Sequence, residues 1–117
     1  PVIGPCAFSS LAASREWLQT DEALAFTRAY AEARRYLNEV SAGEATAVLK
    51  SYFADTDPAA LQTCIGAYQQ LGCWTPHVEI TREALDVTLD IFEYTGGISE
   101  RYPYEAVCAL PPGYSEA

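Results

Sequence analysis

The sequence has no methionine, a single histidine and few basic residues. Its 7 lysines and arginines are outnumbered by 16 aspartates and glutamates, which gives a net charge of -9. A phosphate backbone or an anionic membrane surface repels such an acidic chain, so we expect no nucleic-acid partner. Apolar runs stay well below the roughly 20 residues of a membrane span, and no signal peptide is visible. We therefore expect a soluble protein with no membrane span.

Cysteine pairs of the Cys-x-x-Cys type are also missing. The four cysteines, Cys6, Cys64, Cys73 and Cys108, are spread along the chain, and one histidine does not complete a zinc site with them. We expect no metal and no cofactor. Several disulfide pairings are possible and the spacing does not choose among them. Buried, reduced thiols that pack as small apolar groups are favoured over a disulfide.

What the sequence does contain is a strong helical pattern. Its 117 residues are 50% hydrophobic, which is enough for one domain with a modest core. Between Thr20 and Val40, apolar residues recur in alternating steps of three and four, and this spacing predicts an amphipathic helix. The predicted buried face consists of Ala23, Phe26, Tyr30, Ala33, Leu37 and Val40. The charged stripe on the other side consists of Arg28, Glu32, Arg35 and Glu39.

Start and stop signals predict three further main helices, over residues 42–52, 58–71 and 82–94. The signals are a capping box of Ser41 and Glu44, Asp57 before Pro58, Gly72, and Thr81. The predicted inner face of 58–71 consists of Leu61, Cys64, Ile65, Tyr68 and Leu71, and that of 82–94 consists of Leu85, Leu89, Ile91 and Phe92. A helical turn at 15–19 and a short helix within 104–110 are also expected. The sequence therefore predicts a mostly α chain with four main helices and one short N-terminal strand.

That strand is predicted at residues 6–13, a run of small and apolar residues between Pro5 and Ser14. Its partner strands are not visible in the sequence. The chain also begins Pro1-Val2-Ile3 without a methionine, and we interpret it as a piece of a longer protein. Three regions are expected: a crossover strand and hinge at 1–13, a helical segment at 14–110 and a loose tail at 111–117.

Residues that could carry chemistry are better explained by structural roles. His77 near Glu79 could form an acid–base pair, but no nucleophile motif surrounds them and a surface histidine is favoured. The acidic stripe of residues 82–94 lacks the loop and glycine turn of a calcium site, which favours a solvated helix face. Gly96-Gly97 is interpreted as a helix stop because no lysine follows at the spacing of a phosphate-binding loop. We assign no catalytic residue and expect no enzyme.

Several short segments occur in a characteristic order along the chain. They are Ser14-Arg15-Glu16-Trp17-Leu18, Phe26-Thr27-Arg28-Ala29-Tyr30-Ala31-Glu32-Ala33, Tyr52-Phe53, Asp57-Pro58, Ala67-Tyr68, Leu71-Gly72, Trp74, Ile80-Thr81-Arg82-Glu83-Ala84-Leu85 and Tyr102-Pro103-Tyr104-Glu105. This series, from about Phe8 to Val107, resembles the C-terminal segment of periplasmic substrate-binding proteins. The group in question serves ABC importers of alkanesulfonates, nitrate and thiamine-precursor pyrimidines.

The resemblance implies a two-lobed α/β fold, in which a segment like this one leaves the second lobe by a strand and supplies helices to the first. Most ligand contacts would then come from residues outside this chain. The cleft-proximal candidates for ligand binding within it are Pro5, Cys6, Ala7, Phe8, Ser9 and Ser10. The implied partners are a small-molecule ligand, bound with the missing lobe, and the permease of an ABC transporter. The implied location is periplasmic or extracellular, at the membrane through the importer.

Two other interpretations stay open. A free-standing helical interaction module would need helices that close a core without a second lobe. An enzyme of thiamine-pyrimidine synthesis on the same fold would use a histidine and cysteine-rich motifs that this chain does not match. For a piece of a longer protein, an unpaired strand favours self-association or pairing with the remainder of the parent protein.

Overall fold

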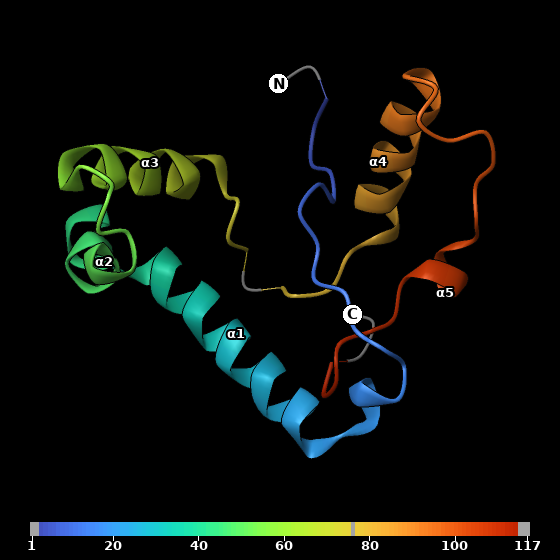
Figure 1. Ribbon diagram of the computed structural model, residues 1–117, viewed down its shortest axis with the longest axis horizontal. Helices are drawn as coiled ribbons and strands as arrows, with labels where there is room; N and C mark the ends of the chain where they lie inside the picture. Colours follow the sequence, from blue (N-terminus) through green and yellow to red (C-terminus); the bar gives the residue numbers. More distant parts are fainter. Residues whose placement is uncertain (1–2, 76, 115–117) are drawn as a thin grey trace. The chain divides into compact units, whose positions relative to one another are not determined.

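A computed structural model describes residues 3–75 and 77–114, which are mostly helical (Figure 1). The chain divides into two compact units: unit 1 comprises Pro1–Leu24 and Glu79–Ala117, and unit 2 comprises Ala25–Val78. The helices are α1 Asp21–Glu39, α2 Ala42–Leu49, α3 Pro58–Leu71, α4 Arg82–Tyr94 and α5 Tyr104–Val107, with the 3-10 helices η1 Trp17–Gln19 and η2 Lys50–Tyr52. The predicted mostly α fold class is confirmed. The regions 1–13, 14–110 and 111–117 stay predictions, and residues 1, 2, 76 and 115–117 of them lie outside the described residues.

In unit 2, side-chain caps set the starts of α2 and α3, and a glycine ends α3. The Ser41 hydroxyl accepts from the Glu44 backbone N–H at 3.2 Å, and the Glu44 carboxylate accepts from the Ser41 N–H at 3.0 Å. Hydrogen bonds from the side chain and the backbone of Ser41 lower the pKa of Glu44. The Asp57 carboxylate accepts from the Ala60 N–H at 3.0 Å, and Gly72 ends α3 with φ of 67°. The predicted capping box is therefore confirmed.

The core of unit 2 lies where α2 and α3 pack together. Ala45, Leu61 and Ile65 are buried there, Ile65 with only 3% of its surface exposed. The partly buried residues around them are Leu37, Val40, Ala42, Leu49 and Trp74. Gln69 adds a polar contact, because its Nε2 donates to the carbonyls of Leu37 at 2.7 Å and Val40 at 2.9 Å. Carbonyls at the end of α1, which the helix itself leaves without a donor, are thereby paired.

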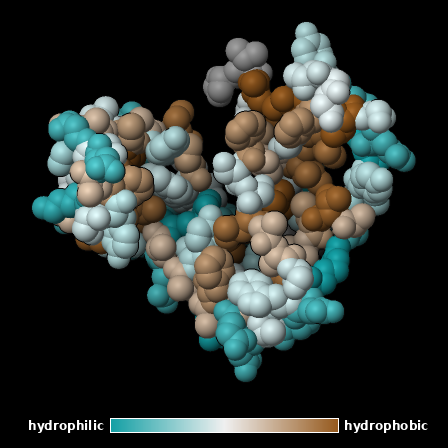
Figure 2. Space-filling view, in the orientation of Figure 1, coloured by the Kyte–Doolittle hydropathy of each residue, from teal (hydrophilic) through white to brown (hydrophobic). Residues whose placement is uncertain are grey.

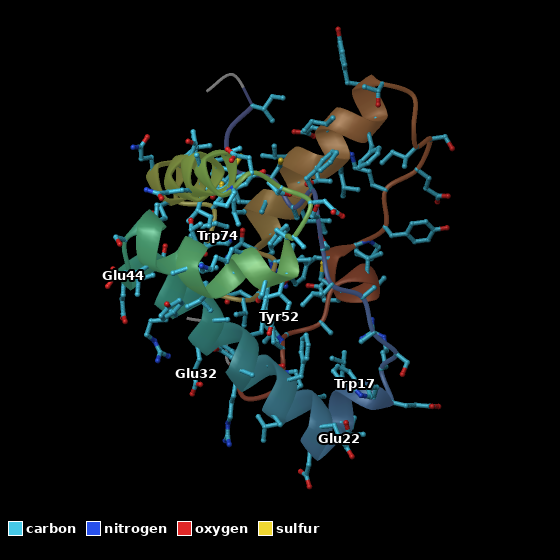
Figure 3. All side chains as sticks on the ribbon, turned by 60° about the vertical axis from the view of Figure 1, so that its left-hand side comes forward. Trp17, Glu22, Glu32, Glu44, Tyr52 and Trp74 are labelled. Atoms are coloured by element: carbon cyan, nitrogen blue, oxygen red, sulfur yellow. The ribbon has the colours of Figure 1, made fainter. Side chains whose placement is uncertain are left out.

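The buried face of α1 is rotated from the predicted one. Ala23, Thr27 and Ala31 are buried, whereas Phe26 is 48% exposed and Ala33 is also exposed. Two neighbouring stripes of this helix carry apolar residues, so the helical spacing alone does not show which of the two is buried. The charged stripe is exposed as predicted: Arg28, Glu32, Arg35 and Glu39. Figure 3 shows Glu32 on the outer side of α1.

The predicted inner face of α3 is also narrower than expected. Leu61 and Ile65 are buried, but Cys64, Tyr68 and Leu71 are exposed, Leu71 by 74%. The prediction was wrong for these three residues because α2 covers one stripe of the helix and leaves its neighbour open. All four cysteines are free thiols; Cys6 and Cys108 are half-buried, whereas Cys64 and Cys73 are exposed. The expectation of buried thiols thus holds in part.

In unit 1, α4 has the predicted bounds. The Thr81 hydroxyl accepts from the Ala84 N–H at 3.1 Å at its start, and Gly96, with φ of 74°, follows its end. Leu85 and Leu89 are half-buried, and Thr88 between them is buried. Phe92, which was expected to face inward, is exposed.

Residues 6–13 form no strand, although one was predicted. They run beside α4 as irregular chain (Figure 1). A strand needs a neighbour that supplies ladder hydrogen bonds. The structure describes no strand elsewhere within 3–75 and 77–114, so no such neighbour is present there. The backbone of Ala7 bonds to helix α4 instead.

Candidate functional site

The predicted ligand-binding residues form one continuous segment of unit 1. Pro5 is exposed, and the next two residues, Cys6 and Ala7, are half-buried. The remaining members are exposed: Phe8, Ser9 and Ser10. The segment therefore turns from the surface of the helix toward solvent at Phe8.

This segment is anchored to α4 at Ala7. The Ala7 N–H donates to the Thr88 hydroxyl at 2.9 Å and to the Ala84 carbonyl at 3.2 Å. A second anchor follows at Arg15, whose guanidinium donates to the carbonyls of Glu105 at 3.2 Å and Ala106 at 3.0 Å in α5. Residues 8–14 thus connect two points that are both fixed within unit 1.

Between the two anchors, the chain has an exposed aromatic ring and polar groups without a hydrogen-bond partner in the described part of the chain. Phe8 is 80% exposed. The hydroxyls and backbone amides of Ser9 and Ser10 bind no partner among the residues that the structure describes. Hydrophobic residues gather where this segment and α4 lie (Figure 2). An aromatic ring beside hydroxyl and amide groups is the kind of lining that fixes a small polar ligand.

The other polar cluster of unit 1 is occupied in holding α5. Arg82 pairs with Glu105 at 2.5 Å and lies 4.4 Å from the centre of the Tyr104 ring. The hydrogen bond from Arg82 lowers the pKa of the Glu105 carboxyl. The Tyr104 hydroxyl donates to the Ile80 carbonyl at 2.5 Å. These groups fix the short helix, so we do not assign a ligand to them.

The acidic face of α4 is exposed as predicted: Glu83, Asp86, Asp90 and Glu93. Arg101 bridges Asp90, at 2.6 Å, and Glu93, and its hydrogen bonds to these carboxylates raise its pKa. His77 is exposed, also as predicted. Within 3–75 and 77–114, no group of three or more histidine, cysteine, aspartate or glutamate side chains could hold a metal ion. The described helices also include none that is long and apolar enough to cross a membrane.

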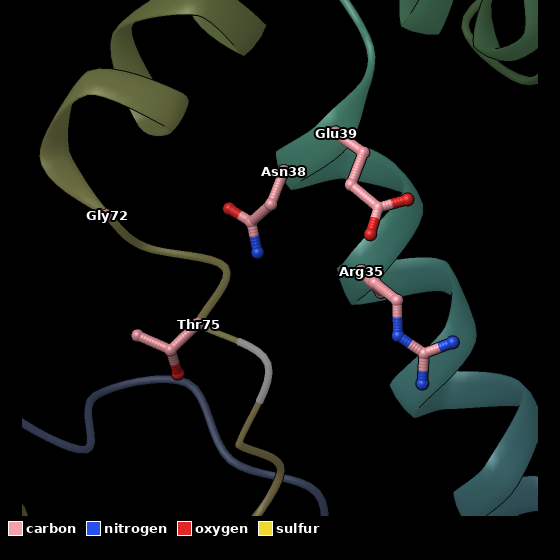
Figure 4. A pocket seen from close by; sticks show the side chains of 5 residues that line it. All are labelled: Arg35, Asn38, Glu39, Gly72 and Thr75. Carbon is pink, nitrogen blue, oxygen red and sulfur yellow. The ribbon is translucent and has the colours of Figure 1, made fainter.

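Unit 2 has an open hollow of about 400 Å³, lined by Arg35, Asn38, Glu39, Gly72 and Thr75 (Figure 4). Asn38 points toward the segment that carries Thr75 and donates to the carbonyls of Arg34, at 3.1 Å, and Trp74. The Thr75 hydroxyl lies 3.4 Å from an Arg34 nitrogen and donates to the His77 carbonyl at 3.3 Å. The Asn38 and Thr75 side chains that line the hollow therefore hold the loop after α3 against α1. For this reason the hollow is a weaker candidate for ligand binding than the segment at Phe8.

Sequence reasoning missed the residues that anchor the candidate segment. Thr88 lies one turn from Ala84 and between Leu85 and Leu89, on the face that was predicted to be apolar. A polar residue on an apolar stripe was the available signal. Arg15 gave no such signal, because its partners Glu105 and Ala106 are 90 and 91 residues away.

Comparison with known proteins adds one relative. The chain is 25% identical over 103 residues to a Bacillus subtilis (strain 168) protein named "Putative binding protein YtlA". The match covers 86% of this chain but 31% of that protein, so the chain spans less than a third of its relative. No family model matches the chain, and no solved structure matches it. The similarity supports a binding role.

Proposed function

We propose that this chain is the C-terminal part of a substrate-binding protein of an ABC importer, with a sulfonate, nitrate or pyrimidine-like small molecule as its ligand. The observation that carries the proposal is the similarity to a named binding protein across 86% of the chain but 31% of the relative. The rest of such a protein would supply the other lobe. We call this longer protein the complete protein.

The packing of the described residues supports this proposal. Half of the chain is hydrophobic, yet among the described residues the buried hydrophobic ones are Ala23, Ala31, Ala45, Leu61 and Ile65. None of the described large side chains is fully buried. Large apolar side chains such as Phe8, Leu71 and Tyr94 are exposed instead, and contiguous patches of such surface are typical of interaction sites. In the proposal, the remainder of the complete protein covers it.

The segment around Phe8 supplies this chain's share of the ligand site. Its exposed ring and the free groups of Ser9 and Ser10 are aimed at a ligand that the missing part also contacts. The anchored segment 8–14 also keeps free backbone groups, which a strand of the missing part can pair. The alternative is pairing with a second copy.

In this role the protein binds its ligand and delivers it to the permease without changing it. It acts as a carrier and not as an enzyme, in a periplasmic or extracellular location. The ligand is bound and released by groups of the two parts together, so a single part has few contacts to offer.

Isothermal titration calorimetry of the 117 residues and of the complete protein tests the proposal. The probes are ethanesulfonate, nitrate and hydroxymethylpyrimidine. We expect the complete protein to bind one probe with micromolar affinity and the 117 residues to bind none. Binding of a probe by the 117 residues alone, or a reading frame that encodes these residues and nothing more, would contradict the proposal.

A double variant sharpens the test. Ser9→Ala with Ser10→Ala removes the two free hydroxyls and should weaken binding of the probe by about ten-fold, since a lost hydrogen bond to a ligand costs roughly 1 kcal/mol or more. Ser99→Ala, at another exposed serine of unit 1, is the control and should leave affinity unchanged.

A further inference from the structure

The anchor at Ala7 has a buried hydroxyl as its nearer acceptor, beside the Ala84 carbonyl at 3.2 Å. Thr88 is 8% exposed, and its Oγ1 lies 2.9 Å from the Ala7 nitrogen and 2.8 Å from the Ala84 carbonyl oxygen. A hydroxyl has one proton to donate and lone pairs to accept with. Thr88 donates that proton to Ala84, so a lone pair faces the Ala7 N–H. Its hydroxyl thus joins the helix and the segment in one network.

Other helical threonines show what is particular about Thr88. Thr46 and Thr63 also donate to the carbonyl four residues earlier, at 2.7 Å and 2.9 Å. That bond is a common local contact within a helix. In these two cases the hydroxyl has no further partner among the described residues. Thr88 alone of the three accepts from a backbone amide 81 residues away.

The position of this contact gives it a consequence for the candidate site. Ala7 immediately precedes Phe8, where the chain becomes exposed, and the free Ser9 and Ser10 follow. Fixing the Ala7 amide therefore limits where these three residues lie. Preorganised groups bind a ligand with a smaller loss of conformational freedom.

We infer that Thr88 is a positioning residue for ligand binding: its hydroxyl holds Ala7 against α4 and so places Phe8, Ser9 and Ser10 for the ligand. This inference rests on the proposed function, because it takes these residues as ligand contacts. Thr88 itself touches no ligand in this account. Its effect passes through the backbone of the segment.

The first test measures the segment in the 117-residue chain by NMR. Thr88→Val keeps the shape of the side chain and removes the acceptor, so exchange of the Ala7 amide should become about two- to ten-fold faster, as expected for one lost hydrogen bond. Order parameters of residues 8–10 should fall at the same time. Thr88→Ser restores a hydroxyl and should restore both values.

Thr63→Val is the matched control, since it removes the same type of intrahelical bond from an exposed threonine. It should leave the Ala7 amide and residues 8–10 as in the wild type. Unchanged Ala7 exchange in Thr88→Val, or the same acceleration in Thr63→Val, would overturn the inference.

The second test measures probe affinity in the complete protein by calorimetry. Thr88→Val should weaken binding by about two- to ten-fold, Thr88→Ser should bind as the wild type does, and Thr63→Val should show no change. Unchanged affinity of Thr88→Val, in a wild type that binds, would overturn the inference and leave the proposed function intact. If the wild-type complete protein binds none of the three probes, the proposed function is wrong, and the role of Thr88 in ligand binding is then also wrong. The exchange measurement then still decides whether Thr88 holds the segment.

Discussion

Units 1 and 2 are stabilised in different ways. Unit 2 has a continuous apolar core, in which Ala45, Leu61 and Ile65 are buried between α2 and α3. In unit 1, Ala23 is the buried hydrophobic residue among those described, and polar contacts tie its segments together. These contacts come from Arg15, Arg82 and Thr88.

This difference indicates that unit 2 is stabilised by its own core, whereas unit 1 leaves more of its apolar surface available for contacts with another protein part. Apolar burial contributes about 25 cal/mol per Å² and needs no further component once the helices pack. Exposed ion pairs contribute at most about 1 kcal/mol each and weaken in salt. Unit 1 therefore places its segments in defined positions without covering them, which agrees with the proposal that the remainder of a longer protein covers them.

The largest expected effect is in the core of unit 2. Ile65→Ala should lower the free energy of unfolding of unit 2 by about 2 to 4 kcal/mol, because the side chain is 3% exposed and its removal leaves a cavity. Leu71→Ala, on the open stripe of the same helix, should change it by less than about 0.5 kcal/mol. Urea titration followed by helical circular dichroism measures both. Equal losses would mean that α3 has no single buried stripe.

A second, smaller effect should come from the polar contact in unit 2. Gln69→Glu replaces a donor with a carboxylate that faces the carbonyls of Leu37 and Val40, and should cost about 2 kcal/mol. Gln70→Glu adds the same charge at the next, exposed position and is the control. The same urea titration compares them. If the two variants are equally stable, the Gln69 amide does not hold the end of α1.

The smallest expected effect is a loosening of α5 in unit 1 when the pH is lowered. Because Arg82 lowers the pKa of folded Glu105, the stabilisation is complete above the unfolded pKa of about 4.3 and is lost as the pH falls through the folded value. Exchange of the Cys108 amide, which bonds to the Tyr104 carbonyl at 2.7 Å, reports the loosening of α5. Glu105→Gln should remove this pH response.

The control for that experiment is Glu100→Gln, which removes an exposed carboxylate outside the ion pair. It should leave the pH response of the Cys108 amide unchanged. A response that survives Glu105→Gln would show that another group holds α5.

Local signals explain why the helices could be predicted. Asp57 before Pro58, Gly72 and Thr81 act on their own neighbours, so α3 and α4 begin and end at the predicted residues. Which stripe of a helix is buried depends instead on contacts with segments that are distant in the sequence. The local pattern therefore predicted Phe26 and Leu71 to be buried, although both are exposed.

The candidate site was less predictable than the helices. Residues 5–10 came from a resemblance to a family and not from a pattern of reactive side chains. Their anchors at Thr88 and Arg15 join residues that are 81 to 91 positions apart. The predicted strand needs partners outside the described residues, so its hydrogen bonds could not be predicted from local sequence.

Hydrogen exchange of residues 8–13, in the 117-residue chain and in the complete protein, tests the central claim most directly. We expect these amides to exchange rapidly in the 117-residue chain, and at least about ten-fold more slowly in the complete protein, where the missing part pairs with them. The amides of Leu61 and Ile65 in unit 2 should change little. Equal exchange of residues 8–13 in both proteins would contradict the account of unit 1 as one part of a larger binding protein.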